Sequence, residues 1–163
     1  MRTLPASFGD FRCAHCRMIV SSAHVLSGVN NRNHCPYCLW SCHLDLFSAG
    51  DRLSACKAPM TPVGLTMKKG RNKYQRLENH RPRGELMLIH ECTDCQTLSI
   101  NRIAADDDSA SVLAVFENSL TLTPRIQARC REYGILILNS ADHEIVQVQL
   151  YGCCAEIPAL SWT

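Results

Sequence analysis

The chain has 163 residues, a net charge of +2 and eleven cysteines, and only 6% of its residues are aromatic. This length corresponds to one domain, or to one domain with an extension. The absence of an apolar run of about 18 residues excludes a transmembrane helix, and residues 1–10 lack the apolar core of a signal peptide. We therefore expect a cytoplasmic protein with no membrane partner, whose cysteines bind metal rather than form disulfides.

The N-terminal third of the chain is rich in metal-ligating residues. After a polar leader, residues 1–10, residues 11–45 contain two Cys-x-x-Cys turns separated by eighteen residues. Each turn presents two thiolates from one tight backbone knuckle, and two knuckles complete a tetrahedral zinc site with no open position for catalysis. This spacing predicts a structural zinc site whose ligands are Cys13, Cys16, Cys35 and Cys38.

The middle of the chain combines an irregular connection with a basic hairpin. Residues 46–64 contain Gly, Pro and Ser and are predicted to be irregular. Strands over 65–67 and 73–77 are predicted to flank a turn at 68–72, where Gly and Asn tolerate a left-handed backbone.

Positive charge is concentrated around this predicted hairpin. Residues 68–83 carry seven basic residues and one acidic residue, whereas residues 84–163 carry four basic and eleven acidic residues. Basic groups contact phosphates, and an aromatic ring stacks on an exposed base. We expect this segment to bind RNA or the ribosome, with contacts from Lys68, Lys69, Arg71, Lys73, Tyr74, Arg76, Arg81 and Arg83.

A third Cys-x-x-Cys turn follows the basic segment. The apolar runs 85–90 and 97–103 are predicted strands on either side of Cys92 and Cys95. A strand, a Cys-x-x-Cys turn and a second strand in this order predict a zinc knuckle at the tip of a β-hairpin.

A second zinc ion requires two further ligands beside this knuckle. Cys56 is the best third ligand, and the fourth is His90, His43 or Cys42. We select His90 and keep His43 as the alternative. His90 stands two residues before Cys92, and side chains two residues apart in an extended strand lie on the same face. The His90 side chain is therefore expected on the same side as the Cys92 thiol.

The C-terminal part is predicted to contain one helix and a β-hairpin. Three aspartates at 106–108 precede an apolar-periodic segment, residues 109–120, which predicts an acid-capped helix of about three turns. Residues 126–133 fit either a short helix or an edge strand. The segments 134–139 and 144–152 are strand-like, the second because apolar and polar residues alternate.

These elements predict a small zinc-stabilised β-rich α+β fold, with zinc knuckles on β-hairpins, one short helix and a C-terminal β-hairpin extension. We place the zinc-binding domain at 11–118 and the extension at 119–163. The cysteines without a metal-binding role are expected to pack as small hydrophobic side chains; they are Cys42, Cys130, Cys153 and Cys154.

The string Arg-Asn-His-Cys-Pro at 32–36 is distinctive. Around it stand Phe-Arg-Cys at 11–13, His-x-Cys-x-x-Cys at 90–95 and Asn-Arg-Ile at 101–103. Over about residues 10–118 the chain resembles the bacterial RNHCP-domain family. The resemblance implies a zinc-binding module whose second ligand set is Cys56, Cys92, Cys95 and either His43 or His90. Where the family pattern has glycine, this chain has Lys57, Ala58 and Gln96.

The string itself has two interpretations. In the structural one, Asn33 caps a turn, Arg32 pairs with an acid such as Asp45, and His34 packs in the interior. In the functional one, Arg32 and His34 line an anion-binding face, together with Arg12, Arg17 and Tyr37. We include Arg32 among the candidate nucleic-acid contacts.

No catalytic signature is present: the sequence lacks GxSxG, P-loop, GxGxxG and HExxH motifs. We therefore do not expect an enzyme. The main hypothesis is a module with two bound zinc ions that associates with RNA or the ribosome. The alternative is a protein-interaction scaffold or oligomerisation module, in which residues 125–163 add a sheet edge for a partner.

Overall fold

The computed structural model describes residues 9–68 and 84–152. In the smaller of its two antiparallel sheets, β1 (Phe11–Arg12) pairs with β2 (Ile19–Val20). The larger sheet has the order β3-β4-β5-β6 and contains β3 (Ser41–Cys42), β4 (Pro59–Lys68), β5 (Glu85–Cys92) and β6 (Leu98–Arg102). The helices are α1 (His24–Ser27), α2 (Ser109–Ser119), α3 (Pro124–Glu132) and α4 (His143–Tyr151), and a 3-10 turn, η1 (Ser140–Asp142), precedes α4.

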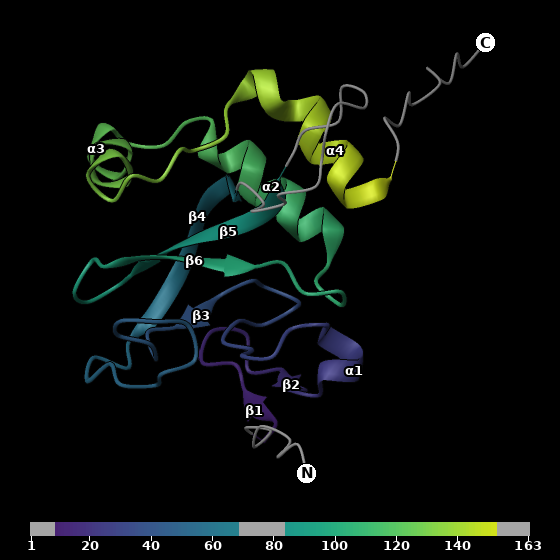
Figure 1. Cartoon of the computed structure of the whole chain (residues 1–163), viewed down its shortest axis with the longest axis vertical. Helices are drawn as coiled ribbons and strands as arrows, with labels where there is room; N and C mark the ends of the chain where they lie inside the picture. Colours follow the sequence, from purple (N-terminus) through teal and green to yellow (C-terminus); the bar gives the residue numbers. More distant parts are fainter. Residues whose placement is uncertain (1–8, 69–83, 153–163) are drawn as a thin grey trace, which may run out of the picture.

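The larger sheet divides the described molecule. Helices α2, α3 and α4 lie on one side of it, and β1, β2 and α1 lie on the other (Figure 1). This arrangement is the small β-rich α+β fold that the sequence predicts. Among the helices of the described residues, none combines the length and the apolar character required to cross a bilayer.

The β4–β5 hairpin is the centre of the sheet and differs from the predicted hairpin. Lys68 pairs with Glu85 and Met60 with Cys92, so residues 65–67 pair with β5. The predicted partner strand, 73–77, lies outside the described residues. Strand β4 also begins at Pro59, inside the segment predicted to be irregular; its prolines are tolerated because Pro59 starts the strand and the register shifts after Pro62.

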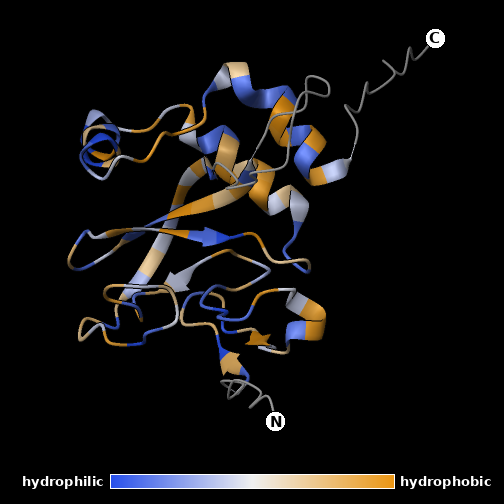
Figure 2. Cartoon of the chain, in the orientation of Figure 1, coloured by the Kyte–Doolittle hydropathy of each residue, from blue (hydrophilic) through white to orange (hydrophobic). Residues whose placement is uncertain are grey.

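The main core lies between the sheet and α2. Leu65 and Leu88 pack against Val112 and Phe116 of α2, which confirms the predicted helix. The N-cap residue of α2 is Asp108, whose side chain accepts a hydrogen bond from the backbone N–H of Ser111 at 2.9 Å. Leu138 and Val146 belong to the same core, and Figure 2 shows hydrophobic residues concentrated along β5.

The predicted C-terminal β-hairpin is wrong. Residues 143–151 form α4, and the segment 134–139 has no assigned strand, although Leu138 N–H donates to Leu65 O at 2.9 Å. Helix formation prevails because Asn139 and Asp142 form a reciprocal capping box at the start of η1. The ambiguous segment 126–133 lies mostly in α3, which begins at Pro124, a favoured first helical residue.

Candidate metal centres

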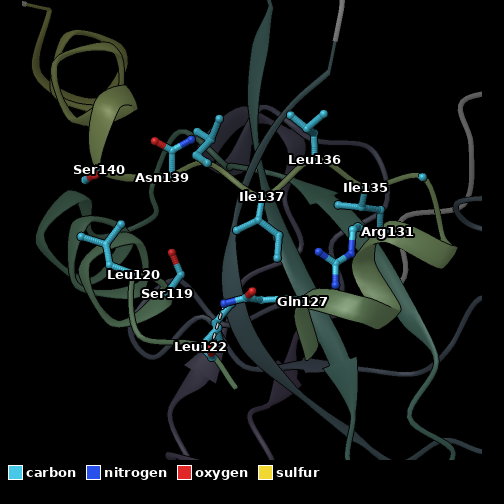
Figure 3. Close-up of a pocket in the computed structure, with 12 residues that line it drawn as sticks. Ser119, Leu120, Leu122, Gln127, Arg131, Ile135, Leu136, Ile137, Asn139 and Ser140 are labelled. Carbon is cyan, nitrogen blue, oxygen red and sulfur yellow. Dashed lines mark hydrogen bonds between the residues drawn. The ribbon is translucent and has the colours of Figure 1, made fainter. Parts of the chain in front are cut away.

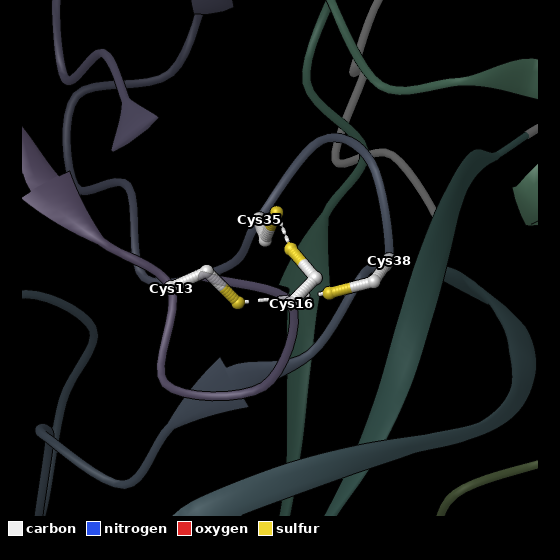
Figure 4. Close-up of side chains that lie close together, drawn as sticks. All are labelled: Cys13, Cys16, Cys35 and Cys38. Carbon is white, nitrogen blue, oxygen red and sulfur yellow. Dashed lines mark hydrogen bonds between the residues drawn. The ribbon is translucent and has the colours of Figure 1, made fainter. Parts of the chain in front are cut away.

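The four cysteines of the first predicted site converge between two turns of the chain (Figure 4). The Sγ atoms of Cys13 and Cys38 are 3.6 Å apart, and those of Cys16 and Cys35 are 3.5 Å apart. A disulfide would hold its sulfurs about 2.05 Å apart. A zinc ion bound at about 2.3 Å to four sulfurs separates them by about 3.8 Å. The group therefore fits one tetrahedral zinc ion.

All three Cys-x-x-Cys turns have the same backbone geometry. The N–H of the first cysteine donates to the carbonyl five residues later, at 2.9 Å in each turn. The N–H of the residue after the second cysteine donates back to the first carbonyl at 2.9–3.1 Å. That residue has a φ of 60° to 66° in each turn; the three are Arg17, Leu39 and Gln96.

The left-handed backbone at positions 57 and 96 accounts for the glycines of the family pattern. Gln96 has a φ of 60° and Lys57, next to Cys56, a φ of 54°. Both stand where glycine is expected, and the chain keeps the turn despite a cost of about 1–2 kcal/mol per non-glycine residue.

Backbone donors surround the sulfurs. The N–H groups of Met18, Trp40 and Thr97 donate to the second sulfur of their own turn. The Met18 hydrogen bond lowers the pKa of Cys16 to about 7. Burial raises the pKa of Cys95, but the hydrogen bonds from Thr97, Cys92 and Cys56 together lower it to about 6. These donors favour the thiolate, which is the form that binds zinc.

The second group contains His43, Cys56, Cys92 and Cys95, whose ligand atoms all lie within 4.8 Å of one another. The Sγ atoms of Cys56 and Cys92 are 3.6 Å apart, and His43 Nδ1 is 3.2 Å from Cys95 Sγ. Three thiols and one imidazole are a common donor set for structural zinc. The two groups fit two zinc sites, as the sequence predicts.

His90, the preferred fourth ligand in the sequence analysis, lies elsewhere. It is fully buried; its Nε2 donates to Leu39 O at 2.7 Å, and its Nδ1 accepts from Asn101 Nδ2 at 2.9 Å. Burial lowers the pKa of His90 to about 3. The alternative, His43, reaches the site because its backbone N–H donates to Ala58 O and so holds it beside the Cys56 loop.

Helix α3 docks on the knuckle of the second group. Arg125 Nη1 and Nη2 donate to the two carboxylate oxygens of Glu91 at 2.8 and 3.0 Å. Arg125 also lies 3.4 Å from Gln96 Oε1, and Arg129 Nη2 donates to Gln96 O at 2.6 Å. The sequence gives no signal for this contact, because α3 and the Cys-x-x-Cys turn are about thirty residues apart in the chain.

Comparison with protein families identifies the chain. A family model described as the RNHCP domain matches residues 8–113. The chain belongs to the RNHCP-domain family. No curated protein and no solved structure matches it. The RNHCP match and the two ligand groups together indicate a zinc-binding module.

The RNHCP string connects the first group to the start of α2. Arg32 Nη1 donates to both oxygens of Asp106 at 2.6 and 2.7 Å, and its Nη2 donates to Asp107 at 3.2 Å. His34 Nε2 lies 2.7 Å from the other Asp107 oxygen. Asn33, rather than Arg32, bonds to Asp45, at 3.2 Å.

These contacts correct one predicted nucleic-acid residue. The Arg32 side chain has no exposed surface and is neutralised by two carboxylates, so it is not available to a phosphate. Of the other candidates, Lys68 is exposed at the end of β4. The rest lie outside the described residues; they are Lys69, Arg71, Lys73, Tyr74, Arg76, Arg81 and Arg83.

The remaining cysteines of the described residues are not part of either RNHCP metal group. Cys42 Sγ lies 3.2 Å from Lys57 O, and Cys130 is buried against Ile89 and its neighbours. Cys153 and Cys154 lie outside the described residues.

Proposed function

We propose that this RNHCP-domain protein is a non-catalytic zinc-binding module that associates with RNA or the ribosome through residues 68–83. The observation that carries this proposal is the concentration of charge. The segment has seven basic residues and one acidic residue, whereas the rest of the chain has ten basic and fourteen acidic residues. A polyanion is therefore attracted to this segment in preference to the rest of the surface.

The arginines of the described residues support this distinction. Several of them bind groups of the protein itself: Arg32 pairs with Asp106 and Asp107, Arg102 with Glu85 and Arg125 with Glu91. Such pairs leave less cationic surface for an external phosphate.

The position of the segment in the sheet also favours the proposal. Lys68 and Glu85 are a cross-strand pair, so the basic segment leaves and re-enters the sheet at adjacent points. The same hairpin carries Cys92 opposite Met60 at its other end. Zinc at the second group would hold the hairpin from which the basic segment emerges.

The donor sets support a non-catalytic role for the metal. Each group offers four protein ligands, and a tetrahedral zinc ion with four protein ligands has no position for water or substrate.

The test is RNA binding as a function of salt. Reversing Lys69, Arg71 and Lys73 to Glu removes three phosphate contacts, and we expect it to abolish retention of single-stranded RNA at physiological salt. Replacing the same three residues by Gln should reduce the salt slope of log K by about 2. Both effects are measured by fluorescence anisotropy with a labelled oligonucleotide.

A matched control separates local from general charge effects. Lys57, Arg102 and Arg131 are exposed in other parts of the molecule, and reversing all three produces the same change in net charge. Equal losses of RNA binding in the two triple variants, or unchanged binding in the segment variant, would contradict the proposal.

A second candidate function, binding of a protein partner, is favoured by an apolar cavity. This cavity of about 620 Å³ is lined by residues 119–122 and 134–140 together with side chains of α3 (Figure 3). Leu136 is 78% exposed beside it. Exposed apolar surface of this kind marks interaction sites.

Light scattering across a range of concentrations tests whether the partner is a second copy. Self-association that is lost in Leu136→Asp, with zinc content unchanged, is the expected result. A monomer at every concentration in the wild-type protein would exclude a second copy as the partner.

A further inference from the structure

A cleft of about 420 Å³ lies beside the first metal group. Its walls come from Gly9 and residues 11–15 on one side and from Trp40, β3 and Arg52 on the other. Among the described residues that line it, three are arginines and none is acidic. The cleft is therefore partly apolar, and its exposed charged side chain is the cation Arg12.

Two aromatic rings line the cleft as a preformed stack. The His15 and Trp40 rings are 4.2 Å apart and lie within 3° of parallel. His15 stands between Cys13 and Cys16, and the backbone N–H of Trp40 donates to Cys38. Both rings are thus tied to turns of the first metal group, which reduces the entropy lost when a third ring stacks on them.

Two of the arginines are placed to meet a negative charge. Arg12 is exposed, with Nη1 3.4 Å from Arg17 O. Arg52 is held by Asn33, to whose Oδ1 its Nη1 donates at 3.1 Å. The Asp45 carboxylate lies 4.0 Å from Arg52 Nε, but Asp45 is not a lining residue of the cleft. The third arginine, Arg32, has its charge neutralised as described above.

We propose that this cleft binds one unstacked nucleotide of a single-stranded RNA. The base stacks on the His15–Trp40 pair, and the adjacent phosphate binds Arg12, with Arg52 contributing to the positive potential. The inference rests on the RNA association proposed above and adds a base-binding site to it. Residues 68–83 supply charge for the strand as a whole, whereas the cleft binds a ring and a phosphate together.

Fluorescence of Trp40 tests the base contact directly. The chain has two tryptophans, so Trp162→Phe leaves Trp40 as the single reporter. In this background we expect AMP to quench the fluorescence and ribose 5-phosphate, which lacks a base, to have no effect. Adenosine should bind more weakly than AMP, and Arg12→Ala should remove that difference.

Binding of a labelled single-stranded oligonucleotide provides the second measurement. His15→Ala should weaken it about tenfold, because one stacking contact is lost. Binding of inorganic polyphosphate should not change, since it has no bases. His24→Ala, an exposed histidine on α1 outside the cleft, is the matched control and should bind RNA normally. Unchanged zinc content and circular dichroism establish that each variant is folded.

The possible outcomes separate the cleft from the RNA association. RNA binding with no AMP quenching and no effect of His15→Ala would overturn the cleft and leave the RNA association in place. AMP quenching without retention of any RNA would support the nucleotide site and overturn the RNA association. A change in Trp40 fluorescence with N-acetylphenylalaninamide but not with AMP would assign the cleft to a protein side chain and overturn the inference.

Discussion

The two metal groups use the same turn but depend on the rest of the fold to different extents. In the first group, two knuckles supply all four sulfurs from within residues 13–38. In the second, one knuckle supplies Cys92 and Cys95, while His43 and Cys56 come from the two ends of the connection between β3 and β4. The first group closes a short stretch of chain, whereas the second requires β3, β4 and β5 to be paired in register.

The second group is also more open to solvent. Cys95 is exposed, whereas every cysteine of the first group is buried or half-buried. The contacts from α3 to Glu91 and Gln96 brace the exposed knuckle from outside the family-matched region, residues 8–113. Equivalent turns therefore need not hold zinc equally well: the first group is stabilised locally and the second by the tertiary structure.

The largest expected effect is the loss of a ligand from either group. Cys16→Ser should release one zinc ion and unfold residues 10–40, because structural zinc contributes about 10–16 kcal/mol of apparent binding free energy. Cys56→Ser should also release one ion but leave the first group folded. Zinc content and amide dispersion in NMR spectra measure both effects. Cys42→Ser is the control and should retain two ions.

The second-largest effect is expected from separate substitutions of the two candidate histidine ligands of the second group. His43→Ala should reduce the zinc content to one ion. His90→Leu should retain two ions and lower the free energy of unfolding by about 1–3 kcal/mol, because Leu39 O and the Asn101 amide lose a buried partner. Elemental analysis and thermal unfolding measure the pair. One zinc ion in His90→Leu and two in His43→Ala would reverse the assignment.

The third prediction concerns the brace from α3. Arg125→Met removes both hydrogen bonds to Glu91, the residue before the ligand Cys92. We expect zinc to leave the second group faster, by at most about tenfold, which is the lower end of the effect of losing a direct hydrogen-bond partner of a ligand. The rate is measured with a chromogenic chelator. Release from the first group, followed in the same experiment, should stay constant; a parallel change at both groups would mean that the variant acts through general instability.

The smallest effect concerns the left-handed position in the turns. Arg17→Gly removes the strain of a φ of 66° and should raise the free energy of unfolding by up to about 1 kcal/mol. Arg17→Ala keeps the strain and should give no gain. Denaturant unfolding with zinc bound measures both variants, and an equal change in the two would indicate an effect of the arginine side chain instead.

The knuckles and the capped helix were predictable because their signals are local. A Cys-x-x-Cys turn needs only its own few residues, and Asp108 caps α2 through a contact with Ser111. The contacts that decide between His43 and His90 as the fourth ligand are not local. It depends on the His43 N–H bond to Ala58 and on the burial of His90 beneath Leu39, and strand periodicity alone favours the wrong residue.

The C-terminal helix, α4, shows a second limit of predicting structure from the sequence. The alternating sequence at 145–150 fits a strand, but it also places Val146 and Leu150 four residues apart on one helical face. Both contact the core that contains Phe116. The capping box at Asn139 stabilises the N-terminus of η1, which leads directly into α4. Such short segments are decided by capping and packing.

Stepwise removal of zinc, followed by native mass spectrometry, tests the central claim most directly. As chelator is added to the wild-type protein, we expect the two-zinc species to pass through an accumulating one-zinc species. Its slow zinc release should match that of Cys56→Ser, which contains only the first group. Loss of both ions in a single step, or a slow step that matches Cys16→Ser instead, would contradict the account of a locally stabilised first centre and a fold-dependent second one.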